Sequence, residues 1–209
     1  MNDITIRHTA LPDIPYLYEI CLKTGDAGKD ASALFYDPYL IGQYYAAPYL
    51  IYPEGICFVA EYKHRPQGYI LAAPDTLAFY QWLEEIWLPP LRKQYPRPFT
   101  HEILRSKKEE KILETIHRSH VSADEKELCL IKDYPAHLHI DMLPAIQGKG
   151  MGRALMNTLC KELAQQHIPG VHLGVANNNP NAIAFYRKTG FSVYSEEEWG
   201  YVMTLITQQ

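Results

Sequence analysis

The sequence lacks an apolar run long enough to cross a bilayer, and its first residues lack a basic segment followed by an apolar core. It also lacks a surplus of positive charge, because its formal net charge is −4 at pH 7. That balance argues against nucleic acid as the main partner. We therefore expect a cytoplasmic protein with neither a membrane nor a nucleic-acid partner.

Paired cysteines are absent too. The four cysteines are widely separated, form no CxxC pair and have no histidine at the spacing of a zinc finger. Since Cys21, Cys57, Cys129 and Cys160 each stand among apolar neighbours, we expect buried, reduced thiols and no metal site.

Repeats, low-complexity tracts and linkers rich in Gly, Ser or Pro are also missing, so we expect one domain over residues 1–209. The spacing of apolar residues, together with the turns and breaks marked by glycine and proline, gives the order of its elements. The order is a strand over 4–9, a helix over 13–23, a hairpin with strands over 56–63 and 67–74, helices over 75–87 and 106–119, strands over 137–143 and 171–176, a helix over 179–190 and two strands within 191–206. We expect the Leu-Pro-Pro sequence at 88–90 to end the helix before it. This order predicts a mixed α/β fold with helices covering one sheet.

The sequence does contain a glycine-rich turn, QGKGMG at 147–152, between a buried strand and a helix. It fails the P-loop pattern because Gly150 stands where Ser or Thr is needed, and it fails the GxGxxG pattern because Arg153 stands at the last small position. A QxxGxG pattern fits, with Gln147, Gly150 and Gly152. Free N–H groups at such a helix start can hold a pyrophosphate, and glycine lets the phosphate approach. A turn that only connects strand and helix is the alternative.

Two segments together carry a family resemblance: IDMLPAIQGKGMGRALMNTL at 140–159 and VANNNPNAIAFYRKTGF at 175–191. They resemble the acetyl-CoA-binding half of the GNAT acyltransferase superfamily. The resemblance implies a mostly antiparallel sheet that splays between its fourth and fifth strands, with helices on both faces. It also implies acetyl-CoA as co-substrate, with pantetheine in the splayed cleft and the pyrophosphate on the glycine turn. The implied cofactor-binding residues are Met142, Leu143, Gln147, Gly148, Lys149, Gly150, Met151, Gly152, Arg153, Asn177, Asn181 and Tyr186.

A narrower likeness lies in CLKTGDAGKDASALFYDPYLIGQYYAAPYL at 21–50. This segment is similar to the acetyltransferase-like domain of animal O-GlcNAc hydrolases and its free-standing bacterial relatives. Some domains of that group are thought not to bind acetyl-CoA. The intact glycine turn favours the kind that does.

The resemblance also implies direct attack of a primary amine on the thioester. The thioester carbonyl would be held by a backbone N–H near Met142 or Leu143. Tyr186 would be the general acid for the departing thiolate. Asn179 and Pro180 provide a helix start, so Tyr186 is expected in the last turn of that helix. The alternative for Tyr186 is a packed aromatic ring.

The general base is less defined, because Ala136 and Gly174 occupy the positions at which several family members carry Glu. His137, His139 and Asp141 alternate along one strand and therefore share a face. Asp141 is the preferred catalytic carboxylate, since it comes nearest the expected thioester. A water-relayed base and the capture of an already neutral amine stay open.

The acceptor is expected to be a small-molecule or peptide amine. Asp26, Asp30 and Asp37 stand among tyrosines that include Tyr45, and carboxylates with aromatic rings suit a cation. These aspartates also fit turn positions, which is the alternative reading. A homodimer is left open. A different class of function is a non-catalytic module that keeps the fold and recognises a protein or glycan partner.

Overall fold

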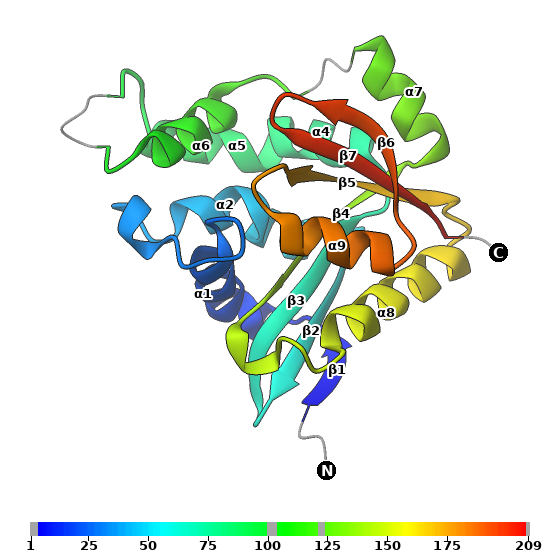
Figure 1. Cartoon of the computed structure of the whole chain (residues 1–209). Helices are drawn as coiled ribbons and strands as arrows, with labels where there is room; N and C mark the ends of the chain where they lie inside the picture. The colour runs from blue at the N-terminus through cyan, green and yellow to red at the C-terminus, as the bar shows by residue number, and fades with distance from the viewer. Residues whose placement is uncertain (1–3, 100–103, 121–123, 208–209) are drawn as a thin grey trace.

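The structure is a computed structural model that describes residues 4–99, 104–120 and 124–207. Its centre is one seven-stranded sheet in the order β1-β2-β3-β4-β5-β7-β6 (Figure 1). The strands are β1 Ile4–His8, β2 Ile56–Tyr62, β3 Arg65–Ala73, β4 Ala136–Met142, β5 Gly170–Ala176, β6 Ser192–Glu197 and β7 Gly200–Ile206. All neighbours pair antiparallel except β4 and β5, which are parallel. The mixed α/β fold expected from the sequence is therefore confirmed.

Helices cover both faces of this sheet (Figure 1). They are α1 Ile14–Thr24, α2 Leu40–Tyr45, α3 Ala47–Ile51, α4 Thr76–Trp82, α5 Leu88–Gln94, α6 Lys107–His117, α7 Glu125–Asp133, α8 Met151–Gln165 and α9 Pro180–Lys188. Successive side chains of β3 point to opposite faces of the sheet, and each face packs into its own apolar core. Tyr69 belongs to the core with Leu17 of α1, whereas Ile70 belongs to the core with Leu155 of α8. No helix within the described residues is long and apolar enough to span a bilayer.

The segment after α4 differs from the prediction. A π-helical turn over Leu83–Trp87 follows α4, and α5 begins at Leu88 with prolines in its first turn. Proline is tolerated there because the first N–H groups of a helix have no intrahelical acceptor. The Leu-Pro-Pro sequence therefore starts a helix and does not end the helical segment.

The expectation for the cysteines is only partly right. All four are free thiols, and Cys21 and Cys57 are buried as expected. Cys160 is half-buried and Cys129 is exposed. Cys129 lies on α7, a helix that the sequence analysis did not identify.

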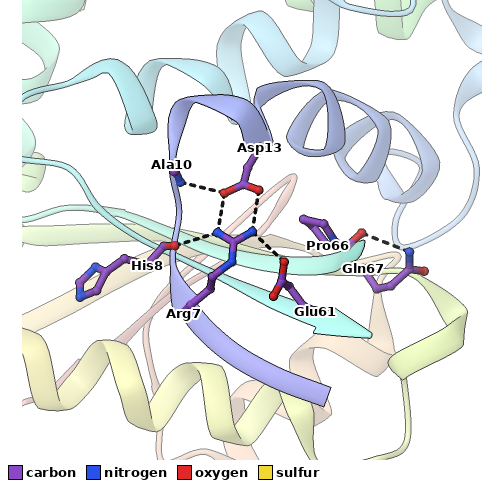
Figure 2. A network of polar contacts seen from close by, with 7 residues as sticks. All are labelled: Arg7, His8, Ala10, Asp13, Glu61, Pro66 and Gln67. Carbon is purple, nitrogen blue, oxygen red and sulfur yellow. Dashed lines mark hydrogen bonds and ion pairs between the residues drawn. The ribbon is translucent and has the colours of Figure 1, made fainter. Parts of the chain in front are cut away.

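An ion-pair cluster at the N-terminal edge joins three elements (Figure 2). The Arg7 guanidinium of β1 donates to both carboxylate oxygens of Asp13 at 2.7 and 2.8 Å, and to Glu61 of β2 at 2.8 Å. The Asp13 carboxylate also accepts the Ala10 N–H at 2.8 Å. The hydrogen bonds from Arg7 hold the pKa of Asp13 below its usual range. The cluster therefore fixes the start of α1 to the sheet.

We expect Asp13→Asn to lower the free energy of unfolding by about 1.5–3 kcal/mol, because it weakens charged hydrogen bonds at a buried carboxyl group. Urea unfolding at neutral pH measures this loss. Glu19→Gln is the control, since it removes an exposed Arg65–Glu19 pair of a kind that contributes at most about 1 kcal/mol. The difference between wild type and Asp13→Asn should shrink as the pH falls through the depressed folded pKa of Asp13, below about 3.9. Equal losses in the two variants would contradict the role of this cluster.

Candidate active site

The sheet opens between β4 and β5. The two strands pair only at Ala136 with Val171 and at His137 with His172, although both strands continue beyond these pairs. On its other edge β4 stays paired with β3 as far as Met142. The splay predicted between the fourth and fifth strands is therefore present, and it begins after His137.

The backbone of β4 offers N–H groups to this gap. The Leu143 N–H donates to the Gln67 carbonyl at 2.8 Å, on the β3 side. Because hydrogen bonding alternates along an antiparallel pair, the N–H groups of Ile140 and Met142 face the opposite side, where β5 has separated. The Leu143 N–H is thus not free for a thioester carbonyl, and this corrects one of the two expected positions. Ile140 is an additional candidate that motif spacing alone did not reveal.

The glycine turn begins α8 as expected. Gly148 and Gly150 have φ values of +71° and +79°, in the left-handed region, and a Cβ on either would meet no atom within 4 Å. No side chain of these two glycines therefore blocks the approach of a ligand to the free N–H groups in the first turn of α8. Gly152 is different, since its Cβ would lie 2.8 Å from Met142 Cε and 2.9 Å from Phe185 Cε2. Gly152 thus allows close packing of α8 against β4 and α9, and its expected place beside a phosphate stays a prediction.

Side chains of the turn have partners of their own. Gln147 Nε2 donates to the Met142 carbonyl at 2.7 Å and so joins the turn to the end of β4. Lys149 Nζ lies 4.9 Å from the centre of the Tyr62 ring, whereas Arg153 is exposed. Met151 is half-buried against the core beneath α8. The backbone of the turn, together with the exposed side chains of Lys149 and Arg153, remains available to an anion.

Helix α9 places Tyr186 beside the gap. The Asn179 side chain caps the helix by accepting the Ala182 N–H at 3.2 Å, and Tyr186 lies in the last turn with 8% of its surface exposed. Its hydroxyl has no hydrogen-bond partner within the described residues. Burial, and then the charge of Asp141, raise the pKa of Tyr186. A protonated phenol near a carboxylate is thus present.

The two asparagines expected at the cofactor are placed differently from each other. Asn177 Nδ2 donates to the Glu198 carbonyl at 3.3 Å, so its side chain ties the end of β5 to the turn before β7. Asn181 is exposed on the first turn of α9.

Asp141 projects from β4 toward the α1 side of the sheet. Its carboxylate accepts the Tyr69 hydroxyl at 2.7 Å. Burial raises the pKa of Asp141 to about 6, although hydrogen bonds from Tyr69 and Thr24 oppose this rise. A carboxylate with such a pKa can accept a proton near neutral pH. Neither Tyr69 nor Thr24 was among the candidates, because the register of β3 on β4 brings Tyr69 to Asp141 and the packing of α1 on β4 brings Thr24.

The two histidines on the same face have different environments. Thr76 Oγ1 donates to the Pro135 carbonyl at 2.7 Å, so it accepts from His137 Nδ1 at 2.8 Å. His137 Nε2 is then the acceptor for the Tyr49 hydroxyl at 2.8 Å. His137 is therefore a neutral core residue with both nitrogens engaged, and it is excluded as a base. Burial lowers the pKa of His139 to about 4, which makes it a weaker proton acceptor than Asp141 near neutral pH.

The residues expected to bind the acceptor do not form one group. Asp26 pairs with Lys108 at 2.6 Å, and Asp30 pairs with Lys23 at 2.7 Å. The Asp37 carboxylate accepts hydrogen bonds from the Tyr95 hydroxyl and from the backbone N–H of Tyr39 in the same turn. In contrast, the Tyr45 ring lies edge-on to His139, with 5.2 Å between ring centres. Of the four, Tyr45 is the one that contacts a side chain on the Asp141 face of β4.

No group of three His, Cys, Asp or Glu side chains within the described ranges could hold a metal ion. The arrangement instead combines unpaired backbone N–H groups, a carboxylate of raised pKa and a protonated phenol around one gap. These are the groups that acyl transfer to an amine requires.

Comparisons with known proteins agree with this geometry. The structure named SsHAT is 30% identical, with a TM-score of 0.87 over 99% of this chain and 100% of that one. PaiA N-acetyltransferase from Thermoplasma acidophilum in complex with coenzyme A is 14% identical, with a TM-score of 0.58 over 97% and 98% of the two chains. Spermidine N-acetyltransferase from Vibrio cholerae in complex with CoA and spermine is 16% identical, with a TM-score of 0.53 over 99% and 97%. A family model described as the acetyltransferase (GNAT) family matches residues 26–191. The chain therefore belongs to the GNAT acetyltransferase family.

Proposed function

We propose that this protein is an acetyl-CoA-dependent N-acetyltransferase that transfers the acetyl group to a primary amine. The observation that carries the proposal is the gap beyond His137, where β4 presents unpaired N–H groups next to the glycine turn at the start of α8. Two similar structures also support the proposal, because their names state that one contains coenzyme A and the other acetyl-CoA.

Acetyl-CoA would use these groups in order along the gap. The free N–H groups at the start of α8 would hold the pyrophosphate, with Arg153 as an added positive charge. The pantetheine arm would lie between β4 and β5, and the N–H groups of Ile140 and Met142 would hold its amide and thioester oxygens. Placing the thioester carbonyl on such an N–H stabilises the negative charge that develops during attack.

Proton transfer would involve one group from each side of the gap. The amine nitrogen forms the new C–N bond, the C–S bond breaks, and the amine loses a proton while the thiolate gains one. Asp141 would take the proton from the amine, directly or through a water molecule, and Tyr186 would give a proton to the thiolate. Because the two groups approach from different helical layers, the acceptor and the coenzyme can enter from different sides.

The acceptor would lie on the Asp141 face of β4, with Tyr45 as one wall. Asp26, Asp30 and Asp37 are not carried into this site, because each has a lysine or tyrosine partner within the protein. The proposed acceptor is a small molecule or peptide with a primary amine. Location in the cytoplasm fits the use of acetyl-CoA and is part of the proposal.

Release of the coenzyme A thiol during incubation of acetyl-CoA with a panel of primary amines tests the function. Tyr186→Phe should then lower kcat about a hundredfold while acetyl-CoA affinity stays unchanged, because the hydroxyl acts when the thiolate leaves. Acetyl-CoA binding without turnover of any amine would instead indicate the non-catalytic binding module. Wild-type kcat in Tyr186→Phe would leave Tyr186 as packing alone.

Two glycines with the same backbone strain make a matched test of the pyrophosphate site. Gly150 and Gly28 have φ values of +79° and +85°, and a Cβ on either meets nothing within 4 Å. We expect Gly150→Val to weaken acetyl-CoA binding in calorimetric titrations by about tenfold or more, because a side chain would stand over the free N–H groups. Gly28→Val should carry the same strain and keep full affinity. Equal affinity of both variants would contradict the site.

The pH dependence of kcat tests Asp141. The base must be ionised, so kcat should rise as the pH increases through about 6, the raised pKa of Asp141. Asp141→Asn should remove this acidic limb of the pH profile, the rise of kcat through about pH 6, and should lower kcat about a hundredfold or more. His139→Gln should keep the limb, since the pKa of His139 is lowered to about 4. Loss of the limb in His139→Gln, with its retention in Asp141→Asn, would assign the base to His139.

A further inference from the structure

A polar cavity lies beside the closed end of the β4–β5 gap. Its volume is about 360 Å³, and its lining residues are Tyr80, Arg118, Ser119, His120 and Glu127. The Tyr80 ring centre is 5.6 Å from that of His137, the residue at which β4 and β5 last pair. The cavity is therefore adjacent to the Asp141 face of β4.

One wall of the cavity is a buried and fully bonded network. His120 Nδ1 contacts Glu84 at 3.0 Å, and His120 Nε2 contacts the Tyr44 hydroxyl at 2.8 Å. Glu84 comes from the π-helical turn and also pairs with Arg92 at 2.8 Å. Hydrogen bonds from Arg92 and His120 outweigh the burial of Glu84 and lower its pKa to about 2, so it stays ionised. With every member satisfied, this wall shapes the cavity and holds its position.

The remaining lining groups are free and are mostly donors. Within the described residues, the Arg118 guanidinium forms no ion pair, and the hydroxyls of Tyr80 and Ser119 have no hydrogen-bond partner. Arg118 offers a planar fork of N–H groups that matches a carboxylate in two-point contact. Burial, and then the charge of Asp124, raise the pKa of Glu127, and the positive charge of Arg118 opposes this rise.

A line of aromatic rings connects this cavity to the proposed reaction centre. Tyr44 is edge-on to Tyr45 with 4.9 Å between ring centres, and Tyr45 is edge-on to His139 at 5.2 Å. The Tyr44 ring also lies 5.7 Å from His120 on the cavity wall. These contacts join the cavity wall to the strand that carries Asp141, so a ligand that reached both would have to lie beside these rings.

We propose that the cavity binds a carboxylate of the acceptor through Arg118, Tyr80 and Ser119, so that the acceptor is an amino-carboxylate whose amine reaches Asp141. This inference rests on the proposed acetyl transfer and specifies its substrate class. The acceptor's amine nitrogen forms the C–N bond, the C–S bond breaks, and the amine proton is balanced by the proton gained by the thiol. The carboxylate takes no part in the chemistry and fixes only the position of the amine. A free amino acid and a peptide with a free C-terminus present the same chemistry.

Matched acceptors test this proposal by thiol release. One arm compares linear ω-amino carboxylates of increasing length with the alkylamines and diamines of the same length. The other arm compares short peptides that end in a carboxylate with the same peptides ending in an amide. We expect kcat/KM to be about tenfold or more higher for the carboxylate of the best length, as expected for a charged hydrogen bond. The arm with the larger preference identifies the source of the carboxylate.

Arg118→Gln should abolish this preference by raising KM for the carboxylate about tenfold, with little change in kcat and none in acetyl-CoA affinity. Arg118→Lys should recover part of it, because the charge remains and the fork is lost. Lys111→Gln, which removes an exposed charge on α6, is the control and should behave as wild type. Thermal melting checks that each variant folds.

The outcomes are distinguishable. Turnover of alkylamines or diamines at equal or higher kcat/KM, with Arg118→Gln indifferent, overturns the carboxylate site and leaves the acetyltransferase standing. Absence of turnover with every amine overturns the proposed function, and the acceptor assignment with it. A preference for carboxylates that survives in Arg118→Gln also overturns the assignment of the cavity.

Discussion

The site depends on one feature of strand pairing, the release of β5 from β4 after His137. Parallel strands normally continue their ladder and leave no N–H group free, whereas here β4 keeps only its bonds to β3. The energetic cost of unpaired backbone groups is then offset when a ligand supplies acceptors in the gap. The same opening sets the position of α8, because Gln147 binds the Met142 carbonyl at the end of the released strand.

Alternation along β4 distributes the chemistry around this gap. Side chains of odd number, among them Asp141, point to the layer of α1, and the backbone groups of Ile140 and Met142 lie in the sheet plane. Tyr186 belongs to the opposite layer, which contains α8 and α9 (Figure 1). A proton acceptor and a proton donor are thus held on different layers, and burial raises the pKa of each. For Asp141 this gives a usable base, and for Tyr186 it keeps the phenol protonated.

The sequence predicted the parts of the molecule that local patterns control. Alternation of apolar and polar residues predicted the strands, the Asn179 cap predicted the start of α9, and the glycine turn with the NPNAIAFY helix identified the GNAT family.

The parts that the sequence did not predict depend on contacts between distant segments. The pairing of Tyr69 with Asp141 requires the β3–β4 register, and the bonding of His137 requires Thr76 and Tyr49 from other elements. Asp26 and Asp37 looked available because their partners Lys108 and Tyr95 come from distant segments of the chain. The partner of Asp30, Lys23, is near in sequence, but only the structure shows that the two pair. Helix α7 was missed because its apolar stripe is short and its Cys129 and Leu128 are exposed.

The π-helical turn over Leu83–Trp87 makes this region sensitive to chain length. A π turn holds one more residue than the α-helical turn it replaces, so deleting a single residue here would remove the bulge while the residues on either side of it keep their facing. Glu84 lies within this turn, so its bonds to His120 and Arg92 are the contacts that such a deletion would disturb. Relatives that differ by one residue in this turn would therefore differ in the shape of the neighbouring cavity without any substitution among its lining residues. Insertions and deletions, more than replacements, are the kind of change through which this part of the fold can diversify.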